Sequence, residues 1–310
     1  MKIFFTLSLI VFFSFSTFSM EKADFSITSD FAYYPKSDFI SGKDHFSPVT
    51  GAYSHLEFRT TGKVSFLFPE IKTKLSGKLE LSPVSIKPGL SIKFTPLPFL
   101  VLDAGSDLGS GWNLGNLIYA APFNGDKENP DYEKFSPFSH IYWDSYISGT
   151  LQFDTAYFFP GDWTHIQALA SYKLMYAHLS GIPQGEFFIW QNSKGKLNGW
   201  QGTFTAVLAY QMPLILQKAG LILEAEKYLN SSSCNEDLYS GYDADFTKIS
   251  ISPLLQFVFN KNHSLSCLFS FSSRQSFEQE HEKSTEEPFL NHIGREWYFR
   301  RIALSYTYSF

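Results

Sequence analysis

Apolar and polar residues alternate along most of this chain, in segments of roughly ten or more residues separated by turn residues. The final segment shows the two faces: Ile302, Leu304, Tyr306, Tyr308 and Phe310 on one, and Arg301, Ala303, Ser305, Thr307 and Ser309 on the other. A period of two places successive side chains on opposite sides of a β-strand. The pattern therefore predicts strands with one apolar face and one polar face.

The chain divides into about twelve such segments, an even number that places both ends of the sheet on the same side of a membrane. The predicted strands are 24–34, 52–68, 72–81, 84–95, 98–107, 140–158, 163–179, 199–211, 219–229, 243–259, 263–276 and 296–310. This division assigns Gly185–Gln191 to a loop, because a strand there would make the count odd.

The connections between the predicted strands differ strongly between the two ends of the sheet. At one end they are short, as at Pro96-Leu97. At the other end most are long: 35–51, 108–139, 180–198, 230–242 and 277–295. Short periplasmic turns, long outer loops and aromatic residues at the strand ends are typical of transmembrane barrels, and they argue against a soluble sandwich. We expect an all-β, antiparallel, up-and-down β-barrel in the bacterial outer membrane.

The first residues have the layout of a secretory signal peptide. Lys2 precedes an apolar run over 3–13, and small residues follow before Met20. The sequence therefore predicts a cleaved signal peptide over 1–19 and a single barrel domain over 20–310.

Composition excludes several other classes of protein. Aromatic residues make up 18% of the chain, as much as the charged residues, whereas soluble domains carry about 25% charged residues. A net charge of -5 leaves no basic surplus for binding nucleic acid. Two cysteines exclude a disulfide scaffold, and no run beyond the N-terminus approaches the length of a transmembrane helix. None of these exclusions affects the predicted barrel.

The C-terminal segment RRIALSYTYSF resembles the assembly signal of bacterial outer-membrane β-barrel proteins. Its signal residues are Ile302, Leu304, Tyr306, Tyr308 and Phe310. The resemblance implies that the barrel assembly machinery recognises this strand and inserts the chain among outer-membrane lipids. The resemblance identifies no porin or transporter subfamily.

Charged residues on the polar faces form two groups along the chain. Arg59, Lys63, Lys74, Lys78, Lys87 and Lys93 come first, Asp103 stands between, and Asp144, Asp154, Glu224 and Glu226 follow. In a closed barrel we expect the two groups to face each other across the lumen and to set up a transverse field in a water-filled pore. In a narrow, filled interior the same residues would have to pair, because unpaired buried charge is costly. The sequence is compatible with both arrangements.

One motif points to enzymatic chemistry. His178 and Ser180 lie two residues apart near the outer end of a strand, with Asn192 downstream, and this arrangement is similar to that of outer-membrane phospholipase A. That family has Asn-Gly after the serine and a glycine two residues before the histidine. Here Gly181-Ile182 and Tyr176 occupy those positions. The alternative interpretation is a histidine at the membrane boundary.

The sequence as a whole favours a passive channel, or porin, for small polar or charged solutes. A non-conducting structural or surface-contact barrel with functional outer loops is the alternative, and a lipid hydrolase is a third interpretation. We assign no catalytic residue and expect no metal, cofactor or nucleic acid. Gly109–Asn113 opens the longest loop, and its glycines permit either a fold back into the lumen or an exposed surface loop.

Overall fold

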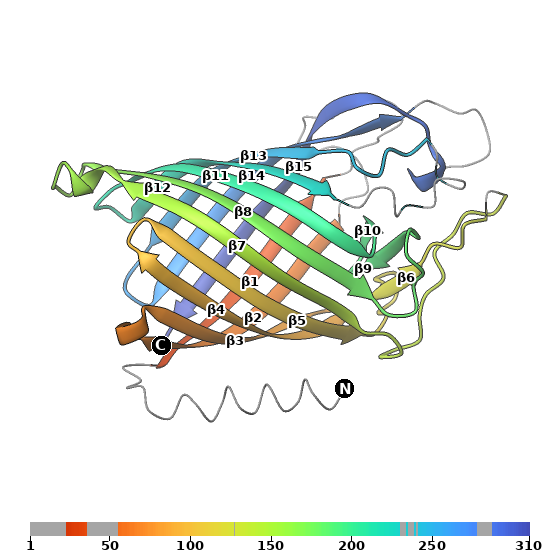
Figure 1. Cartoon of the computed structure of the whole chain (residues 1–310), viewed down its shortest axis with the longest axis horizontal. Coiled ribbons are helices and arrows are strands. Elements are labelled where there is room, and N and C mark those ends of the chain that lie inside the picture. The colour runs from red at the N-terminus through yellow and green to blue at the C-terminus, as the bar shows by residue number, and fades with distance from the viewer. Residues whose placement is uncertain are drawn as a thin grey trace.

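The alternating segments form a closed antiparallel barrel in the computed structural model (Figure 1). The structure describes residues 23–35, 55–126, 128–229, 234, 239, 241–277 and 287–310. The predicted signal peptide lies outside these residues. Among them, no helix is long and apolar enough to cross a membrane.

Twelve strands make up the barrel, as the alternation predicts. They are β1 (Ala23–Tyr34), β2 (His55–Phe68), β3 (Thr73–Ser82), β4 (Ser85–Leu97), β5 (Leu100–Gly111), β7 (Tyr142–Asp154), β8 (His165–Leu179), β11 (Gly199–Gln211), β12 (Leu216–Tyr228), β13 (Lys248–Val258), β14 (His263–Phe277) and β15 (His292–Ser309). Neighbours in the chain pair with each other, and β15 closes the barrel by pairing with β1, where Ser26 lies opposite Ser309.

Several strand limits differ from the predicted ones for local reasons. The strand predicted over 140–158 ends at Asp154, because the Asp154 carboxylate accepts a hydrogen bond from the Ala156 amide and begins the short 3-10 helix η3 (Thr155–Tyr157). β5 continues to Gly111, where the prediction ends at 107. β13 begins at Lys248 and β15 at His292, in place of 243 and 296.

The two ends of the barrel differ, as the lengths of the connections predict. At one end lie tight turns, the 3-10 helices η2 (Pro69–Ile71) and η3, and the C-terminus (Figure 1). At the other end lie the long connections, four of which fall partly outside the described residues. We call these the short-turn end and the loop end.

A second, three-stranded sheet lies at the loop end (Figure 1). It consists of β6 (Ala120–Pro122), β9 (Phe188–Trp190) and β10 (Ser193–Lys196), in the order β10-β9-β6. β9 lies within the segment Gly185–Gln191, so the prediction that this segment is no barrel strand is confirmed. We call β6, β9 and β10, with their flanking residues over 117–123 and 186–198, the mouth insert.

The two faces of the barrel wall have opposite chemistry. The outer face exposes large apolar side chains, among them Leu90, Ile147 and Leu208. The inner face carries serines, threonines and charged residues. A closed barrel leaves no unpaired strand edge, and an apolar outer surface is the one that a bilayer requires. The chain is accordingly a transmembrane β-barrel of the bacterial outer-membrane type, and the predicted fold class and location are confirmed.

Candidate functional site in the barrel lumen

The candidate pore-lining residues all lie on the polar faces of their strands. The basic set is carried by β2, β3 and β4, and Asp103 by β5; the acids lie on β7 and β12. Apolar residues on either side of them point outward; Leu79, Leu102 and Leu223 are examples.

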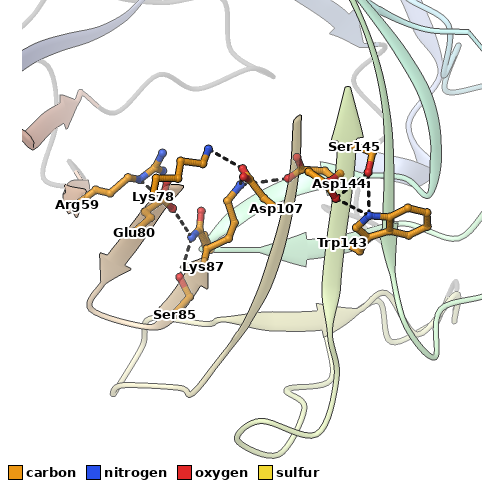
Figure 2. A network of polar contacts seen from close by, with 11 residues as sticks. Arg59, Lys78, Glu80, Ser85, Lys87, Asp107, Trp143, Asp144 and Ser145 are labelled. Carbon is orange, nitrogen blue, oxygen red and sulfur yellow. Dashed lines mark hydrogen bonds and ion pairs between the residues drawn. The ribbon is translucent and has the colours of Figure 1, made fainter. Parts of the chain in front are cut away.

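Two lysines and two aspartates form a chain of ion pairs across four adjacent strands (Figure 2). Lys78 Nζ lies 2.7 Å from Asp107 Oδ2. Lys87 Nζ lies 3.1 Å from Asp107 Oδ2 and 3.1 Å from Asp144 Oδ2, so it joins β5 to β7. Beside this chain, Arg59 Nε lies 3.5 Å from Glu80 Oε1. We call these six residues the ion ladder.

The ion ladder differs from the expected arrangement of two opposed charge groups. Asp144 is bound to Lys87 on the near wall, and Asp103 lies 3.9 Å from Lys93 on the adjacent strand. The reason is the stagger of the strands, which places Gly89 opposite Asp107 and Asp107 opposite Asp144. Basic and acidic side chains therefore pair along one wall. Lys87 and Asp144 do not face each other across the lumen, and neither do Lys93 and Asp103.

The remaining candidate acids lie elsewhere on the wall. Asp154 lies at the short-turn end, 3.0 Å from His165 Nδ1 and 3.0 Å from Gln167 Nε2. Glu224 lies opposite Thr205 on β11, and Glu226 accepts a hydrogen bond from Gln201. Lys74, in the basic set, contacts Asp24 at 3.4 Å, while Lys63 lies opposite Lys78.

Solvent exposure differs strongly among the charged residues of the wall. Near the short-turn end, the side chains of Lys93 and Lys74 are 53% and 37% exposed. In the ion ladder, Arg59 and Lys78 are 40% and 33% exposed, whereas the values are 14% for Lys87, 7% for Asp144 and 5% for Asp107. The lumen is therefore open to solvent at the short-turn end, and the buried charges are those of Lys87 and its two aspartate partners.

The mouth insert contacts the wall directly above the ion ladder. Gln191 Nε2 donates hydrogen bonds to Glu80 Oε1 at 3.1 Å and to Ser85 Oγ at 2.7 Å. The Trp190 ring stacks on Tyr142 with ring centroids 4.4 Å apart. Gly109 makes room for it, because a Cβ there would lie 2.8 Å from the Trp190 ring. The loop after β5 and the loop after β8 thus meet beside the buried part of the ion ladder.

The motif that resembles a lipid hydrolase is not assembled into a catalytic group in this structure. The Ser180 hydroxyl accepts a hydrogen bond from the Ile141 amide at 2.9 Å, and none joins it to His178. Asn192 lies in the mouth insert, where its amide donates to the Ile118 carbonyl. In the part of the chain that the structure describes, no group of three or more His, Cys, Asp or Glu residues is placed to hold a metal ion.

Sequence reasoning missed several residues of this region. Glu80 and Asp107 are the partners of the predicted cations. Their inward orientation could have been predicted, because both lie at polar positions of the alternating pattern. Gln191 and Lys196 both come from the long connection after β8, and no local pattern predicts that Gln191 contacts the wall or that Lys196 lines a cavity beside it. Arg300 faces inward at an irregularity of β15 that alternation does not reveal.

Comparison with known proteins gives structural likenesses only. The sequence matches no protein-family model and no curated protein. The KdgM porin is similar over 92% of this chain and 99% of its own, with 13% identity and a TM-score of 0.37. An outer membrane channel from Pseudomonas putida F1 is similar over 95% and 98%, with 8% identity and a TM-score of 0.49. LpxR from Salmonella typhimurium is similar over 91% and 99%, with 10% identity and a TM-score of 0.43. The fold class accordingly rests on the closed strand order itself.

Proposed function

We propose that the protein is a passive outer-membrane channel for small polar or charged solutes. The observation that carries the proposal is the exposure of charged side chains inside a closed barrel, with Lys93 more than half exposed. Such exposure means that water reaches the charged side chains inside the barrel. A water-filled lumen also avoids the cost of burying charge. The predicted pore-lining residues form the wall of this channel.

The mouth insert and the ion ladder serve as the constriction of the proposed channel. Gln191 fixes the insert to β3 and β4 through two hydrogen bonds, and Trp190 fixes it to β7 by stacking. A constriction of this kind limits the size of the solute, while the charges on the wall tune selectivity.

Conductance in planar lipid bilayers tests the proposal. We expect discrete channel openings from the purified, inserted barrel. Gln191→Ala removes the two hydrogen bonds that join the insert to β3 and β4 and should raise the open conductance or the open fraction. Gln256→Ala is the matched control, because Gln256 lies on the β13 wall without a contact to the insert. A correctly inserted barrel that conducts in neither form contradicts the channel proposal.

A second candidate function is a non-conducting surface-contact barrel. The observation that favours it is a packed aromatic cluster at the loop end. Phe187 lies 5.0 Å from Tyr239 and 4.8 Å from Tyr242 between ring centroids, and Phe123 lies 5.0 Å from Phe289. Loops ordered by such a cluster present a fixed surface to a partner. The absence of conductance in both forms above would favour this candidate.

A further inference from the structure

A cavity of about 120 Å³ lies between the mouth insert and the wall opposite the ion ladder. Its charged lining comes from four elements. Lys194 and Lys196 lie on β10, Glu226 and Lys227 on β12, Lys248 on β13 and Arg300 on β15. Among the side chains that line it, polar groups predominate, and Ser193 adds a hydroxyl.

Positive charge exceeds negative charge in this cavity. Five cations line it with one carboxylate, Glu226, which already accepts a hydrogen bond from Gln201. Lys227 pairs with Asp245 at 3.1 Å. Within the described residues, no carboxylate lies within 4 Å of Lys196, Lys248 or Arg300, although ion pairs of this length are present elsewhere on the wall. These three cations therefore share Glu226 at longer range.

Lys196 is half-buried, as is Arg300, whereas Lys248 is exposed. Burial is the main cause that lowers the pKa of the Lys196 ammonium group, and Lys248 and Arg300 lower it further, while Glu226 opposes them. Burial without a close counter-ion is unfavourable for an ammonium group. An anion bound in the cavity would relieve this cost.

A strand irregularity brings Arg300 into the same cavity. Ser270 pairs with Arg301, whereas Phe271 pairs with Phe299, so Arg300 is an extra residue in β15. Regular alternation would place Arg300 on the lipid side, next to the inward-facing Arg301. The extra residue lets both arginines face the lumen, where Arg301 donates to the Tyr34 hydroxyl at 2.9 Å and Arg300 lines the cavity. Bulges commonly re-aim a side chain in this way.

We propose that this cavity binds an oxyanion, the carboxylate, sulfate or phosphate group of an anionic solute. An ammonium and a guanidinium donate charge-assisted hydrogen bonds to such oxygens, and the guanidinium fork matches two of them. The inference deepens the proposed function by naming the charge of the solute, and it rests on that function for its physiological role. The site lies beside the constriction, where a passing anion would dwell.

Equilibrium binding of inorganic sulfate to the folded, detergent-solubilised barrel tests the proposal. Sulfate is titrated by calorimetry against a constant ionic strength held with sodium chloride. We expect saturable binding. Arg300→Gln and Lys196→Gln should each raise the Kd roughly tenfold to a hundredfold, because each removes charge-assisted hydrogen bonds. Arg300→Lys should retain part of the affinity. Lys261→Gln, in a turn at the short-turn end, is the control and should leave the Kd unchanged.

The titration tests the oxyanion site independently of the channel proposal. Heat-modifiable migration in gels shows that every variant is folded before titration. No saturable sulfate binding, or binding that Arg300→Gln and Lys196→Gln leave unchanged, overturns the inference. The titration needs no conduction, so a barrel that binds sulfate but passes no current contradicts the channel and not the site. A barrel that conducts without binding sulfate contradicts only the site.

Discussion

At the scale of single residues, Lys87 is the centre of the ion ladder. It contacts both Asp107 and Asp144, whose side chains are almost fully buried, and its ammonium lies 5.7 Å from the centre of the Tyr142 ring. Removing one partner of a buried pair leaves an uncompensated charge, which costs about 3–5 kcal/mol. We expect Lys87→Met to lower the free energy of unfolding by that amount, as measured by urea unfolding of the barrel in lipid vesicles.

Lys93→Met is the comparison, because Lys93 is exposed and lies 3.9 Å from Asp103. Its loss should cost under about 1 kcal/mol. The double variant Lys87→Met/Asp144→Asn should recover part of the stability lost in the single variant. Equal losses for Lys87→Met and Lys93→Met would show that the ladder is hydrated and contributes little.

At the scale of strands, the two faces of the wall differ in what they tolerate. Leu208 is exposed on the outer face of β11, and Thr205 on the same strand faces the lumen opposite Glu224. Leu208→Arg should cost about 2–4 kcal/mol at the bilayer midplane. Thr205→Arg should be tolerated, because the guanidinium of the introduced arginine can approach the Glu224 carboxylate. The same unfolding measurement checks both, and equal damage would contradict a lipid-facing outer wall.

Not every inward-facing position accepts a large side chain. Ser270 faces the lumen, but it is buried and hydrogen-bonded to Ser252 at 2.9 Å. Similar hydroxyl pairs join Ser250 to Ser272 and Ser65 to Ser76. An arginine at Ser270 would displace such a pair, so alternation alone is an insufficient guide to tolerance on this face.

The strands could be predicted from the sequence because their signal is local. Apolar and polar residues alternate with a period of two in every strand. The limits of β11 are the ones that the alternation predicts, 199–211. The partners within the lumen could not be predicted in the same way, because they depend on strand stagger. Lys87 reaches Asp107 and Asp144 only after β4, β5 and β7 are placed in register.

The mouth insert and the extra residue Arg300 have no local signal at all. Gln191 meets Glu80 across more than a hundred residues of sequence, and only the closed fold brings them together. One extra residue in a strand does not alter the composition of the segment, and the apolar–polar alternation continues on both sides of it. The parts of the candidate site that sequence missed are therefore those built by long-range contacts.

At the scale of the whole molecule, closure joins the ends of the sheet and fixes the lumen. β15 pairs with β1 over Tyr33 to Ser26, and the Phe310 amide donates to the Phe25 carbonyl at 3.0 Å. The segment predicted to be the assembly signal is thus also the strand that completes the wall. Its lumen side carries Arg301 and, through the extra residue, Arg300. Closure and the proposed oxyanion site consequently depend on the same strand.

Neighbouring lysines on β2, β3 and β4 predict that the proposed channel selects anions. Lys63 lies opposite Lys78, and Lys74 lies opposite Lys93, so cations are neighbours on the solvent-exposed wall. Ions that pass within about 8–10 Å feel this potential at physiological salt. The reversal potential of the wild-type channel across a salt gradient should therefore indicate anions. Asp103 reduces the effect near Lys93 without abolishing it.

Reversing exposed cations tests this selectivity. The double variant Lys63→Glu/Lys93→Glu should shift the reversal potential toward cations, and the shift should be larger at low salt because screening is weaker. Lys78 is unsuitable, since a glutamate there would face the buried Asp107 carboxylate. Lys261→Glu, in the turn after β13, changes one charge outside the lumen wall and should leave the potential nearly unchanged. A channel whose selectivity ignores the double reversal would place the path of the ions away from β2, β3 and β4.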